Sequence, residues 1–142
     1  MFTFTIHVPT WLQGELDSYL LRDDHKKCCL GFYLEALGVP LSHLHMRSTP
    51  TDALSVPEDA QWLLKKEVYD GDGNVELLTD SDISADLINF NDSRYDNRSQ
   101  YYFVDENGKT PADYYSWLLD KMRAIQKRFA KVGVEVRWEG IA

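Results

Sequence analysis

Strict alternation of apolar and polar residues marks both ends of the chain. Residues 2–8 read Phe-Thr-Phe-Thr-Ile-His-Val, and residues 133–138 read Gly-Val-Glu-Val-Arg-Trp. A period of two residues is typical of strands with one apolar face, so both segments are predicted strands. Because the two patterns match in length and character, we expect the strands to pair as neighbours in one small sheet.

Four segments between these strands have the spacing of helices. Residues 10–20 follow a proline, and residues 79–92 open with Thr-Asp-Ser-Asp, an acidic helix start, and end near an Asn-Asp pair. Residues 28–37, Cys-Cys-Leu-Gly-Phe-Tyr-Leu-Glu-Ala-Leu, are apolar on almost every side, which predicts a buried helix. Residues 110–132 open with Thr-Pro and carry one apolar stripe over about six turns, so we expect this long helix to pack across the sheet.

The buried helix 28–37 supplies the predicted centre of the core. We expect Leu30, Leu34 and Leu37 to be almost fully buried, with the adjacent cysteines beside them. Gly31 lies inside this helix, where glycine costs about 1 kcal/mol relative to alanine. We therefore expect another element to approach the helix closely at Gly31.

Proline, glycine and polar residues mark the remaining connections. Residues 41–60 predict a long loop with a short helical turn, and residues 61–78 predict a hairpin around Asp-Gly-Asp-Gly-Asn. Residues 101–104, Tyr-Tyr-Phe-Val, form a further predicted strand. Without an internal repeat or a domain boundary, residues 1–142 are predicted to form one α+β domain. Its small sheet, which includes the paired terminal strands, packs against the long C-terminal helix and the buried Cys-Cys-Leu-Gly helix.

The composition is that of a globular domain. Of 142 residues, 44% are hydrophobic and 13% are aromatic, which excludes a disordered chain. No apolar run reaches the length of about 18 residues that a membrane span needs, and the first residues lack the features of a secretory signal. The two cysteines are adjacent, where a bond between them would be strained, so we expect free thiols and a reducing cytoplasm.

A set of short motifs runs through the middle of the chain. Cys-Cys-Leu-Gly at residues 28–31 is followed by Leu-Gly-Val at 37–39, Leu-Ile-Asn-Phe-Asn-Asp at 87–92 and Gly-Lys-Thr at 108–110. Over roughly residues 11–120, this order of motifs resembles a group of small phage and prophage proteins. The resemblance implies an origin in a phage or mobile element and a helical core, but no activity. The terminal strands, the basic end of the last helix and the insertion between the last two motifs depart from the group's pattern.

Charge is distributed unevenly along the chain. The net charge is −8, which argues against direct nucleic-acid binding through phosphate neutralisation. Residues 1–108 hold 8 basic and 19 acidic residues, whereas residues 109–142 hold 7 basic and 4 acidic ones, and residues 52–106 alone hold 4 basic and 14 acidic ones. An acidic face of this kind can bind a basic surface through complementary fields, although ordinary solubility charge explains the same count.

Most of the acids in this region lie on predicted turns and helix starts, and therefore face water. The candidate partner-binding residues are Asp70, Asp72, Glu76, Asp80, Asp82, Asp86, Asp96, Asp105 and Glu106. Such a face could mimic a nucleic-acid backbone and block a basic groove on a host enzyme.

Three groups of polar residues are weaker candidates for chemistry. Asn91 and Asp92 could form a general-base or ligand site, or else cap the end of their helix. The cysteine pair begins a helix after two lysines, which could activate a thiol, but buried structural cysteine is the favoured interpretation. His43 and His45 have a spacing that suits zinc, with His7 and Asp52 as possible partners, yet no third ligand is identifiable, so no metal or cofactor is assigned.

We therefore expect a cytoplasmic, phage-encoded binding protein and not a catalyst. Its acidic face would engage a basic surface of a host protein or protein–nucleic-acid complex, as an inhibitor of a host defence or nucleic-acid-processing complex. A small enzyme or ligand-binding protein with a polar site at Asn91 and Asp92 is the alternative from another class. A third interpretation is an accessory protein that forms a homodimer through its aromatic surface.

Overall fold

A computed structural model of the chain describes residues 2–12, 19–50, 53, 55–68, 76–92 and 114–140. Two short sheets and several helices make up these residues, which is the α+β class that the sequence predicts. In chain order the elements are β1 (Phe2–His7), the 3-10 turn η1 (Val8–Thr10), α1 (Cys29–Ala36), α2 (Leu41–Leu44), the 3-10 turn η3 (Glu58–Leu63), β2 (Leu64–Val68), β3 (Glu76–Asp80), α3 (Asp82–Asp92), α4 (Tyr114–Ala130) and β4 (Val134–Glu139).

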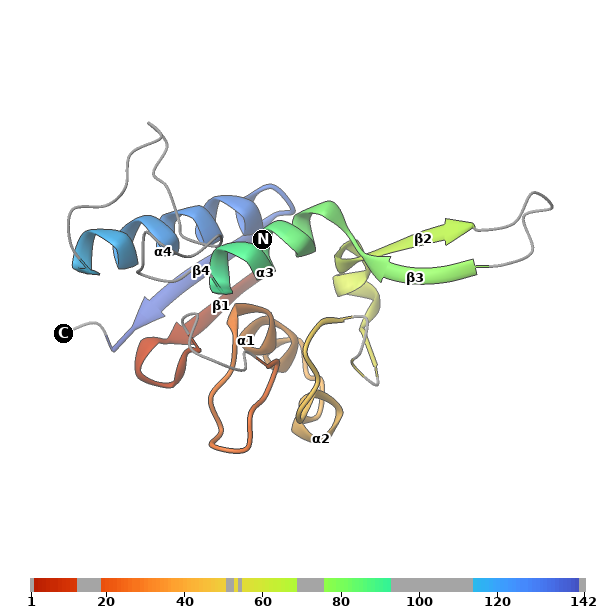
Figure 1. Ribbon diagram of the computed structural model, residues 1–142, viewed down its shortest axis with the longest axis horizontal. Helices are drawn as coiled ribbons and strands as arrows, with labels where there is room; N and C mark the ends of the chain where they lie inside the picture. The colour runs from red at the N-terminus through yellow and green to blue at the C-terminus, as the bar shows by residue number, and fades with distance from the viewer. Residues whose placement is uncertain are drawn as a thin grey trace.

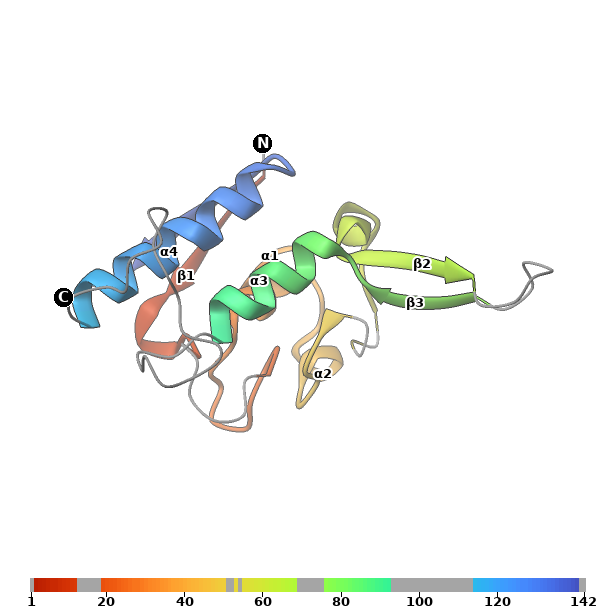
Figure 2. The same cartoon turned by 45° about the horizontal axis from the view of Figure 1, so that its top comes forward.

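The first and last strands of the chain are neighbours, as predicted. Strands β1 and β4 run parallel, in a register that pairs Phe2 with Val134 and His7 with Glu139. The alternation places Phe4 and Val136 on a buried face of this sheet, whereas the threonines and charged residues between the buried positions stay more open. Helix α4 packs on β4, α1 packs on β1, and α3 lies between the two helices (Figures 1 and 2).

Helix α1 is the buried helix that the apolar run predicts. Leu30 and Leu34 are fully buried, and both cysteines lie in the same core. A Cβ atom on Gly31 would lie 1.8 Å from the backbone oxygen of Leu20, which confirms that a second segment crosses the helix here. The expectation for Leu37 is wrong: this residue is only partly buried, because it forms the C-cap where the chain leaves the core.

The helix predicted at residues 10–20 is absent at both of its described ends; residues 13–18 lie outside the described part. The amide of Leu12 donates to the Lys27 oxygen at 2.8 Å, and the amide of Leu20 donates to the Arg47 oxygen at 2.7 Å. Leu12 and Leu20 are therefore not helical and are tied to distant segments. Backbone hydrogen bonds across the fold have overridden the helical spacing of the apolar side chains.

Two other predicted boundaries shift, and two fall outside the described residues. The helix expected from Thr79 begins at Asp82, because the chain up to Asp80 remains in β3 and the Ser81 hydroxyl accepts the Ser84 amide at 3.1 Å as an N-cap. The long loop at 41–60 contains α2 and the first residues of η3. The strand predicted at 101–104 and the helix start at 110–113 lie in the undescribed part of the chain.

The second sheet is a separate hairpin. Strands β2 and β3 pair antiparallel, from Leu64 opposite Asp80 to Val68 opposite Glu76. Both views show the hairpin extending away from the helices (Figures 1 and 2). The predicted hairpin is thereby confirmed, but its bounds differ: residues 61–63 belong to η3, and β3 continues to Asp80. The turn lies outside the described residues. Among the described helices, none is long and apolar enough to cross a membrane.

Candidate functional site

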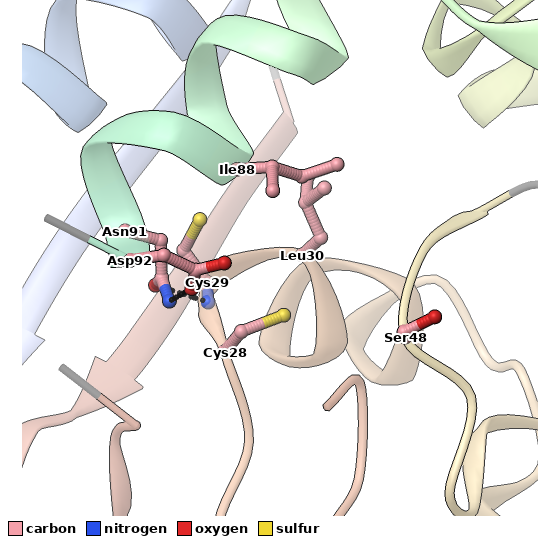
Figure 3. A pocket seen from close by; sticks show the side chains of 7 residues that line it. All are labelled: Cys28, Cys29, Leu30, Ser48, Ile88, Asn91 and Asp92. Atoms are coloured by element: carbon pink, nitrogen blue, oxygen red, sulfur yellow. Dashed lines mark hydrogen bonds between the residues drawn. The ribbon is translucent and has the colours of Figure 1, made fainter. Parts of the chain in front are cut away.

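The end of α3 meets the start of α1 at the polar pair that the sequence singles out. Asn91 is 1% exposed. Its Oδ1 accepts hydrogen bonds from Trp11 Nε1 at 2.7 Å and from the Cys29 amide at 2.9 Å. Its Nδ2 donates to the Leu12 oxygen at 2.9 Å and to Asp92 Oδ1 at 3.0 Å. Asn91 therefore joins three segments, and Figure 3 shows it beside the first turn of α1.

Asn91 acts as a helix cap, but it caps the start of α1 and not, as expected, the end of its own helix α3. The first amides of a helix lack partners within it. In α1 the N-cap residue Cys28 makes no side-chain capping bond, and the Asn91 oxygen supplies one from the end of α3. The carboxamide has two acceptor sites and two donors, and the described residues fill all four. Little of Asn91 is left to bind a ligand.

A small cavity adjoins this junction. It has a volume of about 10 Å³ and is lined by Cys28, Cys29, Leu30, Ser48, Ile88, Asn91 and Asp92. Figure 3 shows Ser48 set apart on its own segment, whereas Asn91 and Asp92 lie close together. A space of about this size holds one water molecule. The predicted ligand site at Asn91 and Asp92 is thus too small, as described, for an organic substrate.

The two thiols in this junction are buried and protonated. Burial raises the pKa of Cys28 to about 12, and burial also raises the pKa of Cys29 well above its ordinary value. The nearby lysine Lys27 forms an ion pair with Glu35 and stacks over the Phe32 ring at 4.7 Å from its centroid. Because the thiolate is the nucleophilic form, the geometry favours the structural interpretation of the cysteines over the catalytic one.

Lys121 on α4 is a member of this region that the sequence reasoning missed. Its side chain is 0% exposed, which is rare for lysine. Its Nζ lies 4.5 Å from the ring centroid of Trp117 and 5.8 Å from that of Trp11. Burial lowers the pKa of Lys121 to about 7, against the opposing effect of the Asp92 charge. The sequence holds one signal for this burial: Lys121 follows Leu118 by three residues, which places it on the apolar stripe of the helix that faces the core.

The acidic residues of the predicted partner surface are described only in part. Asp82 is exposed at the start of α3, and Asp80 lies at the end of the hairpin. Asp86 faces α4, where its Oδ2 accepts a hydrogen bond from Arg128 Nε at 3.2 Å. Part of the acidic charge of α3 is therefore neutralised by the basic helix α4. Glu76 belongs to β3, while Asp70, Asp72, Asp96, Asp105 and Glu106 lie outside the described residues.

The histidines that had a zinc-like spacing face different partners. His43 Nδ1 lies 2.8 Å from the Ser55 hydroxyl, whereas His45 Nε2 contacts the Asp23 carboxylate. His7 pairs with Glu139 instead. Within the described part of the chain, no three His, Cys, Asp or Glu side chains gather as a metal site would require.

Comparisons with protein-family models, with curated proteins and with solved structures found no match to this chain. The similarity to phage proteins therefore stays a prediction from the motifs.

Proposed function

We propose that this chain is a binding protein that docks on a basic protein surface through the β2–β3 hairpin and the adjoining start of α3. The observation that carries the proposal is the hairpin, which extends from the body as a sheet of its own (Figure 1). A two-stranded sheet in water is marginally stable by itself, and an exposed strand edge can pair with an extended segment of a partner.

Charge supports a basic partner. Residues 52–106, which contain the hairpin and α3, hold 14 acidic and 4 basic residues. Asp80 and Asp82 lie at the base of the hairpin, and Asp70 and Asp72 belong to its turn segment in the sequence. An acidic arm would be steered toward a surface rich in lysine and arginine, and its association rate would fall as salt rises.

The proposed target is a host defence or nucleic-acid-processing complex in the cytoplasm. Complexes that hold nucleic acids present basic grooves, and a row of carboxylates can occupy such a groove in place of phosphates. The motif resemblance to phage proteins supports a host target. Two buried, protonated thiols suit a reducing compartment.

The alternative functions have less support. A small enzyme or ligand-binding protein centred on Asn91 and Asp92 would need a larger cavity than the one of about 10 Å³ beside these residues. A homodimer is a competing use of the same hairpin, because a second copy can pair with a strand edge. Sedimentation of the purified chain distinguishes a dimer from a partner complex.

The test uses a partner captured from host lysate at low salt, identified, and then purified. Its affinity is measured for the wild type and for a variant in which Asp70, Asp72, Asp80 and Asp82 are changed to Lys. We expect the four reversals to weaken binding at least about tenfold, because like charges across an interface cost several kcal/mol. We also expect the wild-type affinity to fall with salt.

A matched control separates the hairpin from net charge. Changing Asp23, Asp24, Glu135 and Glu139 to Lys alters the net charge by the same amount at exposed or half-exposed positions outside the hairpin. We expect this control to keep most of the affinity. Equal losses of affinity in the two variants, or a wild-type affinity that does not change with salt concentration, would contradict the proposal.

A further inference from the structure

A groove lies where β1 and β4 begin, toward the C-terminal end of α1, whereas the small cavity beside the cysteines lies at the start of that helix. Its volume is about 300 Å³, at the lower end of the usual range for ligand pockets. It is lined by Phe2, Tyr33, Leu37, Asp59, Trp62, Val132, Gly133 and Val134. The lining comes from both strands' ends, from α1 and from η3, so only the folded chain assembles it.

Aromatic rings form most of one wall of this groove. The ring centroids of Phe2 and Tyr33 are 6.0 Å apart at an interplanar angle of 80°, and those of Tyr33 and Trp62 are 5.5 Å apart at 48°. Phe129 lies behind them, with its centroid 5.8 Å from that of Trp62. Phe2 is 37% exposed, and Trp62 is partly exposed. Aromatic surface is thus available at the groove instead of being used up in the core.

Hydrogen bonds hold two of these rings in place. Trp62 Nε1 donates to the Tyr33 hydroxyl at 3.0 Å, and that hydroxyl donates to the backbone oxygen of Asp59 at 3.4 Å. The polar edges of the two rings are therefore engaged with each other and with η3. What remains for a ligand is ring surface, which carries the negative side of the aromatic quadrupole.

An acidic residue, Asp59, also lines the groove. Asp59 is exposed in the first turn of η3, and none of the described cations forms an ion pair with it. Burial raises the pKa of Tyr33, the hydrogen bond from Trp62 opposes that shift, and the Asp59 charge adds to it. Because Asp59 lines the groove and has an exposed side chain, its negative charge makes the site attractive to positive charge.

We propose that this groove binds an alkylated ammonium group, held between the Phe2 and Trp62 rings and the Asp59 carboxylate. Ring faces and one carboxylate attract a large, weakly hydrated organic cation, and the leucine and valine side chains favour its methyl groups. A metal ion is disfavoured because the groove offers one carboxylate among apolar groups. The cation proposal does not use the acidic hairpin as evidence, so either proposal can fail without the other.

The first test compares cations with a neutral molecule of the same shape. Tetramethylammonium, choline and the uncharged choline isostere 3,3-dimethyl-1-butanol are titrated into the full chain, with ionic strength held constant and amide shifts followed by NMR. We expect saturable shifts at Trp62 and Tyr33 with both cations. We expect the isostere to bind at least about 10-fold more weakly, since cation–π attraction is lost.

Substitutions then assign the contacts. Asp59→Asn is expected to weaken choline binding about 3-fold or more, and Trp62→Leu about 10-fold. Glu58→Gln removes the neighbouring charge on η3, and Trp138→Leu removes a partly buried tryptophan far from the groove, so both controls should bind like the wild type. If Trp62→Leu fails to fold by circular dichroism, Asp59→Asn and the isostere comparison still decide the matter.

A further titration distinguishes two sources of the cation, a methylated lysine side chain and a free small molecule. A short peptide carrying trimethyllysine is compared with free choline and with the same peptide carrying norleucine. Tighter binding of the trimethyllysine peptide assigns the site to a protein side chain, and tighter binding of choline assigns it to a small molecule. Equal binding of the neutral and cationic probes, or no saturable shift with any cation, would overturn the proposal.

Discussion

Replacing Asn91 with alanine removes four described hydrogen bonds, three of which join α3 to α1 and to the segment after β1. The change leaves three groups of the neighbouring segments without this partner: the Trp11 indole N–H, the Cys29 amide and the Leu12 carbonyl. A buried polar group that loses its partner costs about 1–3 kcal/mol. One water molecule can enter from the adjoining cavity and recover part of this cost. We therefore expect Asn91→Ala to lower the free energy of unfolding by about 3–5 kcal/mol, a large share of the 5–15 kcal/mol typical of a domain.

Urea unfolding followed by tryptophan fluorescence measures this loss as a shift of the midpoint at an unchanged slope. Asn89→Ala is the matched control, because Asn89 is exposed on the same helix, and its effect should stay within about 0.5 kcal/mol. A loss below about 1 kcal/mol for Asn91→Ala would refute the junction role. It would also return Asn91 to the ligand-binding interpretation, which predicts lost binding at little cost in stability.

Three further outcomes follow from the core. Gly31→Ala should abolish or severely weaken folding in a thermal melt, because the new Cβ would lie 1.8 Å from the Leu20 oxygen; a melting temperature within two degrees of wild type would contradict this. Lys121→Met should stabilise the chain more near pH 7 than near pH 8.5. The folded-state pKa of Lys121, about 7, lies below its ordinary value of 10.5, so between pH 7 and pH 8.5 the unfolded wild type binds more protons than the folded one. The wild type therefore gains stability as pH rises, and the advantage of the Lys121→Met variant shrinks. The window stops below pH 9, where ionisation of unfolded Cys28 would work in the opposite direction. Both thiols, Cys28 and Cys29, should react with a disulfide reagent such as DTNB only after urea unfolds the chain, and prompt reaction of the native protein would contradict their burial.

Local sequence patterns predicted the elements whose position depends mainly on burying their own apolar surface. The alternation at both termini predicted β1 and β4, and the apolar run at α1 predicted a buried helix, because burying that surface requires little knowledge of partners. The parallel direction of β1 and β4 did not follow from alternation, which is the same for either direction. A parallel pair needs a crossover connection, and residues 8–133, which contain all the other elements, are long enough to make one without fixing the direction.

Predictions failed where distant polar contacts decide the structure. Trp11 fits a helical pattern, yet its indole donates to Asn91, 80 residues away, and the backbone beside it bonds to Lys27. Neither contact has a signal in the spacing of apolar residues. Lys121 was overlooked for a related reason. A lysine on a surface helix ordinarily faces water, so its position on the apolar stripe was a weak signal, and the packing of Trp11 and Trp117 around it shows its burial.

The groove and the hairpin are joined through η3, so a substitution in η3 can affect both sites. The variant that tests the two proposals separately therefore has to be chosen with care. Asp59 and Trp62 line the groove, and the next residues of the chain, from Leu64, form β2. Trp62 also packs on Phe129 of the core, so its substitution can shift the base of the hairpin as well as remove the ring. Asp59 has an exposed side chain, and its contact with Tyr33 is made by the backbone. Asp59→Asn therefore changes the groove's charge while leaving the support of β2 intact. A loss of cation binding with unchanged partner affinity in this one variant would establish two separate sites on the same chain.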